Sequence, residues 1–119
     1  MPTFPVSYVE INSPEPDKSQ LFLEQVFGWD LQPFADPSYR VAPHGERAGV
    51  DAGLLQSRDG QPRVVPVIRV DDLAATVALA VSTGATVVVP PFEMGGLGAG
   101  CYLTDPAGVL IGLHHYNAG

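Results

Sequence analysis

The stretch GCYLTDPAGVLIGLHH, residues 100–115, decides the fold of this chain. Two runs of mainly apolar or β-branched residues, 102–104 and 109–114, flank the segment Asp-Pro-Ala-Gly, whose residue types favour a tight turn. The stretch is therefore predicted to form a β-hairpin whose register is set by the turn.

Alternation along this hairpin predicts two different faces. On the first strand Leu103 should face a buried layer, while Tyr102 and Thr104 should face wetter surroundings. On the second strand, one face is formed by Leu110, Gly112 and His114. The hairpin is therefore expected to form a wall with a packed layer on one side and a cavity on the other.

Composition limits the kind of protein that the chain can be. Its 119 residues are enough for one domain with a hydrophobic core. The content of 45% hydrophobic and 16% charged residues is typical of a globular chain. No segment has the length of a transmembrane helix, and the N-terminus lacks the features of a signal peptide, so a cytoplasmic protein without a membrane partner is expected.

Charge and cysteine content exclude further classes. The net charge of -7, without a basic stripe, argues against nucleic acid as a partner. The single cysteine, Cys101, cannot form an intramolecular disulfide and has no basic neighbour in sequence. It is predicted to be a buried structural thiol rather than a nucleophile.

The first half of the chain has the pattern of a strand, a helix and three more strands. Residues 6–11 alternate like a strand, and the prolines and acidic residues of segment 14–17 favour a helix start. The helix is expected to end at Gly28 and to pack on a sheet through a stripe formed by Leu21, Phe22, Val26 and Trp29. Short strands are predicted at 31–34, 39–42 and 50–55.

The same order repeats after the polar stretch SRDGQP, residues 57–62. A strand at 64–70 precedes a helix capped by Asp71 or Asp72 and ending at Gly84, with a core stripe of Leu73, Val77, Ala80 and Val81. A strand at 86–89 is expected to stop at Pro90-Pro91, and the hairpin follows. The pattern predicts a single domain, 1–119, made of two βαβββ modules at about 5–57 and 63–116.

Several motifs occur in order along these modules: Phe27-Gly28-Trp29, the segment RVDDL at 69–73, and Asp-Pro-Ala-Gly at 105–108 before an apolar strand. Together they resemble the vicinal oxygen chelate superfamily, which includes glyoxalase I, bleomycin-resistance proteins and extradiol dioxygenases. Segment 93–112 further resembles the glyoxalase-like subgroup. The resemblance implies an α+β fold whose two βαβββ modules form a curved mixed sheet cup, and it implies a homodimer, which exposed sheet edges make physically reasonable.

The resemblance also implies a divalent metal held by three or four His, Glu or Gln side chains inside the cup. Carried over one position at a time, the ligands fall at Tyr8, Gly53, Val65 and Gly112. Valine and glycine offer no donor side chain, and a phenol ionises only near pH ~10, so no metal is predicted. A two-residue change of strand register would place Glu10 or His114 at a ligand position, which keeps a divalent metal as an alternative.

Two ionisable positions allow more than one interpretation. His114 and His115 are neighbours on a strand, so they point to opposite faces and cannot hold one ion together without a bulge. His114 is predicted to line the pocket and His115 to lie at a surface or interface. Glu10 is either a general base with a raised pKa or a structural partner of Arg69 or Arg40.

Aromatic and glycine-rich segments add two predictions. Of the possible aromatic cage residues, Tyr8 and Tyr102 fit a cavity better than Phe92, and Trp29 fits the core. The segment GGLGAG, residues 95–100, lacks the Lys-Ser/Thr pair and the following helix of a phosphate-binding loop. It is expected to be a flexible lid or a connecting loop.

These observations predict a bleomycin-resistance-like protein that binds a small apolar or aromatic molecule without a catalytic metal. The predicted ligand-binding residues are Tyr8, Glu10, Val67, Tyr102 and His114. The alternative is a lyase, isomerase or dioxygenase of the same superfamily that uses Glu10 or His114 as a base or metal ligand. A non-catalytic interaction domain, whose own side chains fill the cavity, is a third class, and kinship of fold does not decide among them.

Overall fold

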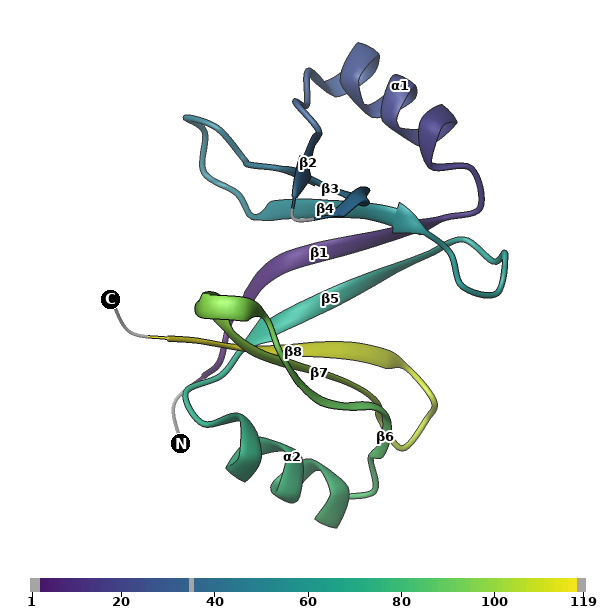
Figure 1. Ribbon diagram of the computed structural model, residues 1–119. Helices are drawn as coiled ribbons and strands as arrows, with labels where there is room; N and C mark the ends of the chain where they lie inside the picture. Colours follow the sequence, from purple (N-terminus) through teal and green to yellow (C-terminus); the bar gives the residue numbers. More distant parts are fainter. Residues whose placement is uncertain (1–2, 35, 118–119) are drawn as a thin grey trace. The chain divides into compact units, whose positions relative to one another are not determined.

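The computed structural model describes residues 3–34 and 36–117, and within them it contains two α-helices and eight strands in two compact units (Figure 1). The first unit is Ser7–Val65, and the second consists of residues 66–117 with residues 3–6. The element order β-α-β-β-β occurs twice, which confirms the α+β class and the two modules. That the modules form one domain stays a prediction. No helix in the described residues is long and apolar enough to cross a membrane.

The strands of the first unit follow the order β2-β3-β4-β1. Their bounds are β1 (Val6–Ser13), β2 (Gln32–Phe34), β3 (Asp36–Ala42) and β4 (Asp51–Gln56). The strand β1 runs parallel to β4, with Glu10 opposite Gly53, whereas β2, β3 and β4 are antiparallel neighbours. All four strands predicted in this half are confirmed, with small shifts at their ends.

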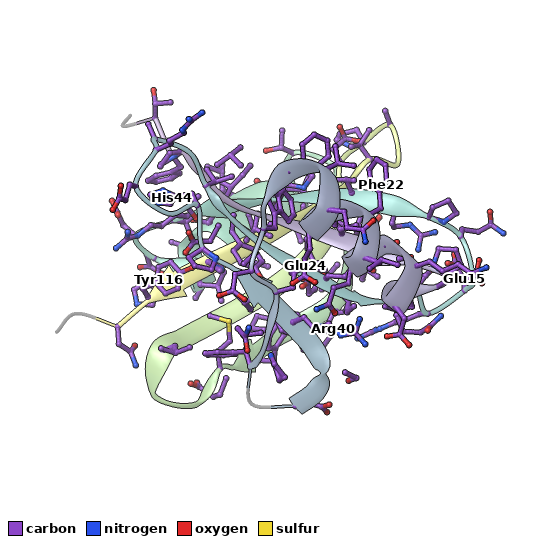
Figure 2. All side chains as sticks on the ribbon, turned by 90° about the horizontal axis from the view of Figure 1, so that it is seen from above. Glu15, Phe22, Glu24, Arg40, His44 and Tyr116 are labelled. Carbon is purple, nitrogen blue, oxygen red and sulfur yellow. The ribbon has the colours of Figure 1, made fainter. Side chains whose placement is uncertain are left out.

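The helix of the first unit, α1 (Pro16–Phe27), begins with a proline and ends at Gly28, whose φ of 72° suits a residue without a Cβ. The predicted core stripe is wrong, because Leu21, Phe22 and Val26 are 58%, 57% and 56% exposed. Phe22, labelled in Figure 2, packs instead on Phe27 of the same helix, with 5.9 Å between ring centroids.

Two other residues connect α1 to the core of the first unit. Leu23 and Trp29 pack against a buried cluster of Leu31, Ala42 and Leu54. The contact with this cluster confirms the predicted core position of Trp29. Its predicted place on the helical stripe is wrong, because α1 ends at Phe27. The helical spacing of the apolar residues defined a continuous face, but the side of α1 that meets the sheet is the one that carries Leu23.

The strands of the second unit follow the order β5-β8-β7-β6. Their bounds are β5 (Arg63–Arg69), β6 (Thr86–Glu93), β7 (Gly98–Thr104) and β8 (Leu110–Tyr116), and the division between the units falls within β5. The predicted hairpin is confirmed as β7 and β8, which are antiparallel with Tyr102 opposite Gly112. The strand β5 lies parallel to β8 on the other side, with Arg69 opposite His114.

The helix of the second unit, α2 (Leu73–Ser82), lies along β6, β7 and β8 (Figure 1). The Ala75 N–H donates to the Asp72 carboxylate at 3.0 Å, so the predicted cap is confirmed. Leu73 is buried, and Val77 and Ala80 pack against the same core. Val81 is 50% exposed, so its predicted core position is wrong.

The core of the second unit confirms two predictions from the hairpin. Leu103 is only 5% exposed, as its place in the alternation requires. Cys101 is 1% exposed, and its Sγ donates to the Val89 carbonyl at 3.2 Å. Burial raises the pKa of this thiol, which suits a structural rather than a nucleophilic cysteine.

The prolines of the second half do not end a strand as predicted. The strand β6 continues past Pro90 and Pro91 to Glu93, with register shifts on either side of Val89. Because β6 is the last strand in the order of its unit, the missing N–H groups of the prolines break no ladder on its outer side.

The glycine-rich segment is also more regular than predicted. Gly95–Leu97 forms a short 3-10 turn, and β7 already begins at Gly98. The Met94 N–H donates to the Gly98 carbonyl at 2.8 Å, which closes the turn. Gly98 has a φ of 142°, and a Cβ there would overlap the backbone carbonyl of His115. The lid interpretation is therefore wrong for residues 98–100.

Candidate functional site

The five residues predicted to bind a ligand divide between the two units. Tyr8 and Glu10 alternate along β1 in the first unit. Val67, Tyr102 and His114 come from β5, β7 and β8 in the second unit. Within each unit the group shares one face of the sheet, since strand neighbours such as Ile11 and Leu103 belong to the packed layer on the other face. That all five bind one ligand stays a prediction.

Two aromatic rings lie flat on the sheet of the second unit. The rings of Phe92 and Tyr102 are stacked, with centroids 6.0 Å apart and planes 14° from parallel. A Cβ added at Gly100 would lie 2.9 Å from the Phe92 ring, and one at Gly112 would lie 3.2 Å from the Tyr102 ring. The two glycines therefore let the rings approach the backbone directly, and we call Phe92 and Tyr102 the aromatic platform.

Val67 lies beside this platform. Its Cγ2 is 3.1 Å from the position of a Cβ at Gly112, so Val67 and Tyr102 flank the same glycine from neighbouring strands. Val67 is 4% exposed, whereas Phe92 is 37% exposed. The apolar surface is thus buried at Val67 and reaches solvent at Phe92.

A polar cluster lies next along the same face. The Nδ1 of His114 and the Tyr116 hydroxyl are 2.9 Å apart and share a hydrogen bond. The guanidinium carbon of Arg69 is 5.0 Å from the centroid of the Tyr116 ring, a cation–π distance. Tyr116 is labelled in Figure 2. We call Arg69, His114 and Tyr116 the Arg69 cluster.

His114 is neutral in this setting. Burial lowers its pKa, because it disfavours the charged imidazolium, and the nearby Arg69 and His115 lower it further. The ordinary pKa of 6.5 already lies below neutral pH, and the shift is downward, so the imidazole is mainly uncharged at pH 7. Arg69 is therefore the charged member of the cluster.

The corresponding face of the first unit is covered by two tyrosines. The hydroxyls of Tyr8 and Tyr39 are 2.5 Å apart and share a hydrogen bond. A Cβ at Gly53 would overlap the Tyr8 hydroxyl and lie 2.7 Å from that of Tyr39. Glu10, opposite Gly53 on the neighbouring strand, is 6% exposed. This unit therefore presents a buried carboxylate beside a pair of phenols.

The predicted ion pair between Glu10 and Arg40 is wrong. The Nη2 of Arg40, which is labelled in Figure 2, lies 2.7 Å from the Asp17 carboxylate at the start of α1. Arg40 stands opposite Leu54, a residue of the packed layer, so strand alternation turns its side chain away from the face of Glu10.

The four positions implied for metal ligands do not fit a divalent ion. The space over Gly53 holds the hydroxyls of Tyr8 and Tyr39, and the space over Gly112 holds the Tyr102 ring and Val67. Val65 is 1% exposed and has no donor atom. Among the described residues, no three His, Cys, Asp or Glu side chains gather as a metal site would require. The alternative register supplies only Glu10 and His114.

Replacing Gly53 with alanine is expected to break the hydrogen bond between Tyr8 and Tyr39, because the new methyl overlaps the Tyr8 hydroxyl. The free energy of unfolding should fall by about 1–3 kcal/mol. Denaturant unfolding of Gly53→Ala, Tyr8→Phe and the double variant measures this effect. Since Tyr8→Phe removes the overlapping oxygen, the double variant should lose less stability than the sum of the single variants; an additive result would contradict the arrangement.

A hollow of about 500 Å³ lies beside the start of α1 in the first unit, and the sequence did not predict it. Its lining includes Ile11, Asn12, Ser13, Lys18, Arg63 and Val64. Both cations at its rim already have carboxylate partners, because Lys18 pairs with Glu15 at 2.8 Å and Arg63 pairs with Asp59 at 2.6 Å. The hollow therefore offers no unpaired charge to a ligand.

Sequence reasoning missed two residues that shape these surfaces. Tyr39 lies in a segment broken by prolines, where no alternation identified the face that it shares with Tyr8. Tyr116 follows His114 by two residues, so continuing the alternation of the last strand would have found it. Phe92 was considered for a cage but ranked below Tyr8 and Tyr102, because the strand neighbours of those two tyrosines, Val9 and Leu103, already supplied the buried layer.

Comparisons with known proteins agree with this architecture. The repeated βαβββ order, together with the family match, identifies the chain as a protein of the vicinal oxygen chelate class. The family described as "Glyoxalase-like domain" matches residues 8–114, and the chain belongs to this family.

Relatives in sequence and structure carry different activities in their names. "Putative glyoxylase CFP32" of Mycobacterium tuberculosis (strain CDC 1551 / Oshkosh) is 28% identical over 93% of this chain, and the match covers 45% of that protein, so the chain spans about half its length. Methylmalonyl-CoA epimerase from Mycobacterium tuberculosis is similar in fold, with a TM-score of 0.63 and 19% identity over 94% of this chain and 87% of the other. The Mn(II)-bound glyoxalase from Novosphingobium aromaticivorans has a TM-score of 0.68 and 19% identity over 95% of this chain and 40% of the other.

Proposed function

We propose that this chain binds a small apolar or aromatic molecule on the aromatic platform, and that it does so without a catalytic metal. The observation that supports this function is the stack of Phe92 and Tyr102 directly over two backbone glycines. A flat ligand can lie against such rings, and an aromatic pair contributes about 0.5–1.5 kcal/mol beyond the apolar area that it buries.

The surroundings of the platform suit a small-molecule site. Val67 adds an apolar contact, and the Arg69 cluster adds a few polar groups at one end. Small-molecule sites commonly combine a mainly apolar lining with a small number of polar groups that fix the orientation of the ligand. A protein that only sequesters a ligand needs no reacting group at its site, and neither ring of the aromatic platform supplies one.

The tyrosines over Gly53 and next to Gly112 support the absence of a metal from this function. A glutamate at Gly53 would require Tyr8 to move, since its first side-chain carbon would overlap the Tyr8 hydroxyl. One at Gly112 would press that carbon against Val67 and the Tyr102 ring, at 3.1 and 3.2 Å. The Mn(II)-bound glyoxalase is a structural neighbour that holds a metal, but the residues of this chain at the positions implied by the family resemblance do not supply the ligands.

The second candidate function is an enzyme of the same superfamily. It is favoured by Glu10, a carboxylate that is only 6% exposed, and by the neutral imidazole of His114. Either group is suited to accept a proton from a bound substrate. A compound that binds and is recovered unchanged would favour sequestration, whereas its conversion would favour this alternative.

Binding to the platform can be measured by titrating the purified chain with indole, naphthalene-2-carboxamide and cyclohexanol while recording ligand resonances by NMR. We expect the aromatic compounds to bind more tightly than cyclohexanol, and Phe92→Ala to weaken them about tenfold. Chelation with EDTA should leave the affinity unchanged.

The matched control is Phe34→Ala, which removes a 48% exposed phenylalanine from the first unit. It should bind like the unchanged chain. Failure of all three compounds to bind, or an equal loss in both variants, would contradict the proposed site, and a loss of affinity in EDTA would contradict its independence from metal.

A further inference from the structure

We propose that the natural ligand of the platform carries a carboxylate, and that Arg69 binds this carboxylate. The inference rests on the proposed function, because it assigns the polar end of the molecule whose flat part lies on Phe92 and Tyr102. It names the chemical class of the ligand, an aromatic or similarly flat carboxylic acid.

The register of the sheet places Arg69 close to the platform. Val67 lies opposite Gly112, and two residues further along the same strands Arg69 lies opposite His114. Two residues of a strand span about 7 Å, and both pairs project from the same face. An aromatic ring with a short acidic side chain covers this distance, so one molecule can touch both the platform and Arg69.

Among residues 3–34 and 36–117, no carboxylate lies within 4.0 Å of the Arg69 guanidinium. Three of the other cations are paired, since Lys18, Arg40 and Arg63 lie 2.8, 2.7 and 2.6 Å from Glu15, Asp17 and Asp59 respectively, whereas Arg47 and Arg58 lie in the first unit, which does not carry the platform. The contact that the structure shows for the Arg69 guanidinium is the face of the Tyr116 ring at 5.0 Å. This contact holds the group without neutralising it.

The geometry of a guanidinium favours a carboxylate over a neutral group. Its planar fork of N–H donors matches the two oxygens of a carboxylate, and stacking on a ring leaves the edge of the fork available for them. Arg69 is exposed, so an incoming anion can reach it. His114 adds no competing charge, and Tyr116 fixes the position of both residues.

Acidic residues near Arg69 do not replace such a ligand. Asp71 follows two residues later and is exposed, and it makes no ion pair with Arg69 within 4.0 Å. Asp72 accepts the Ala75 N–H and caps α2. The chain has a net charge of -7, which repels anions. An arginine without a paired carboxylate offsets this repulsion locally and so favours acids at this one place.

The test compares acids with their matched amides: indole-3-acetate with indole-3-acetamide, and naphthalene-2-carboxylate with naphthalene-2-carboxamide. Affinities are measured for the full chain, for Arg69→Gln, for Arg69→Lys, and for the control Arg58→Gln, which removes an exposed arginine of the first unit. We expect each acid to bind about tenfold more tightly than its amide. Arg69→Gln should abolish this preference, Arg69→Lys should keep part of it, and Arg58→Gln should keep all of it.

The outcomes separate this inference from the function on which it rests. Equal affinity for acids and amides in the unchanged chain would overturn the assignment of a carboxylate and leave aromatic binding intact. A preference for acids that survives in Arg69→Gln would overturn the role of Arg69. If neither acids nor amides bind, the proposed function itself is wrong. Thermal melting of each variant shows whether it is folded. If Arg69→Gln does not fold, Arg69→Lys tests the site in its place.

Discussion

Gly98→Ala should lower the free energy of unfolding by about 3 kcal/mol or more, through backbone strain and steric overlap together. The φ of Gly98 is 142°, a conformation that side chains with a Cβ rarely adopt, and the added carbon would overlap the His115 carbonyl. Since that carbonyl belongs to the backbone of β8, no side-chain rotation relieves the overlap. Denaturant unfolding of the variant measures the loss.

Gly96→Ala is the matched control for this substitution. Gly96 lies in the same turn, but a Cβ there would meet no atom within 4 Å. Its stability should therefore stay within about 0.5 kcal/mol of the unchanged chain. Equal losses in the two variants would show that the close approach of β7 and β8 at Gly98 is not formed in solution.

Leu54→Ala is expected to destabilise the first unit by about 2–5 kcal/mol. Leu54 is 0% exposed and lies in the cluster that Leu23 and Trp29 contact from outside the sheet. Its removal leaves a cavity that the surrounding strands cannot fill completely. The loss should be visible as a lower midpoint of unfolding in urea.

Leu21→Ala is the matched control, because it makes the same leucine-to-alanine truncation on the exposed surface of α1. Leu21 is 58% exposed, so its truncation should change stability by only about 0.5 kcal/mol. If Leu21→Ala proved as costly as Leu54→Ala, the face of α1 that carries Leu21 would be buried after all. The originally expected stripe of Leu21, Phe22 and Val26 would then be correct.

The order of the elements could be predicted because each has a local signal. Proline at the start of α1, Gly28 at its end, the Asp72 cap of α2 and the turn at 105–108 all act within a few residues. The orientation of α1 could not be predicted in this way. Which apolar residues of a helix meet the sheet depends on how the helix docks. Residues distant in sequence, such as Ala42 and Leu54, determine this docking.

The candidate site was predictable only where strand alternation was clear. Tyr102 and His114 follow from the hairpin, and the structure places them on one face. Arg69 was considered only as a partner of Glu10, because its position opposite His114 depends on the parallel pairing of β5 with β8. The overlap of Tyr8 with the space over Gly53 is likewise a contact between strands that no local pattern encodes.

Pro90 and Pro91 also protect the second unit from aggregation. The preceding residues Thr86–Val89 are strongly β-forming, and Val88 is 53% exposed, so an unbroken edge here would be a template on which strands of other molecules could assemble. Proline has no N–H to offer such a strand. The two prolines therefore act as gatekeepers that limit intermolecular pairing to the few residues before them, although they remain part of the strand within the chain.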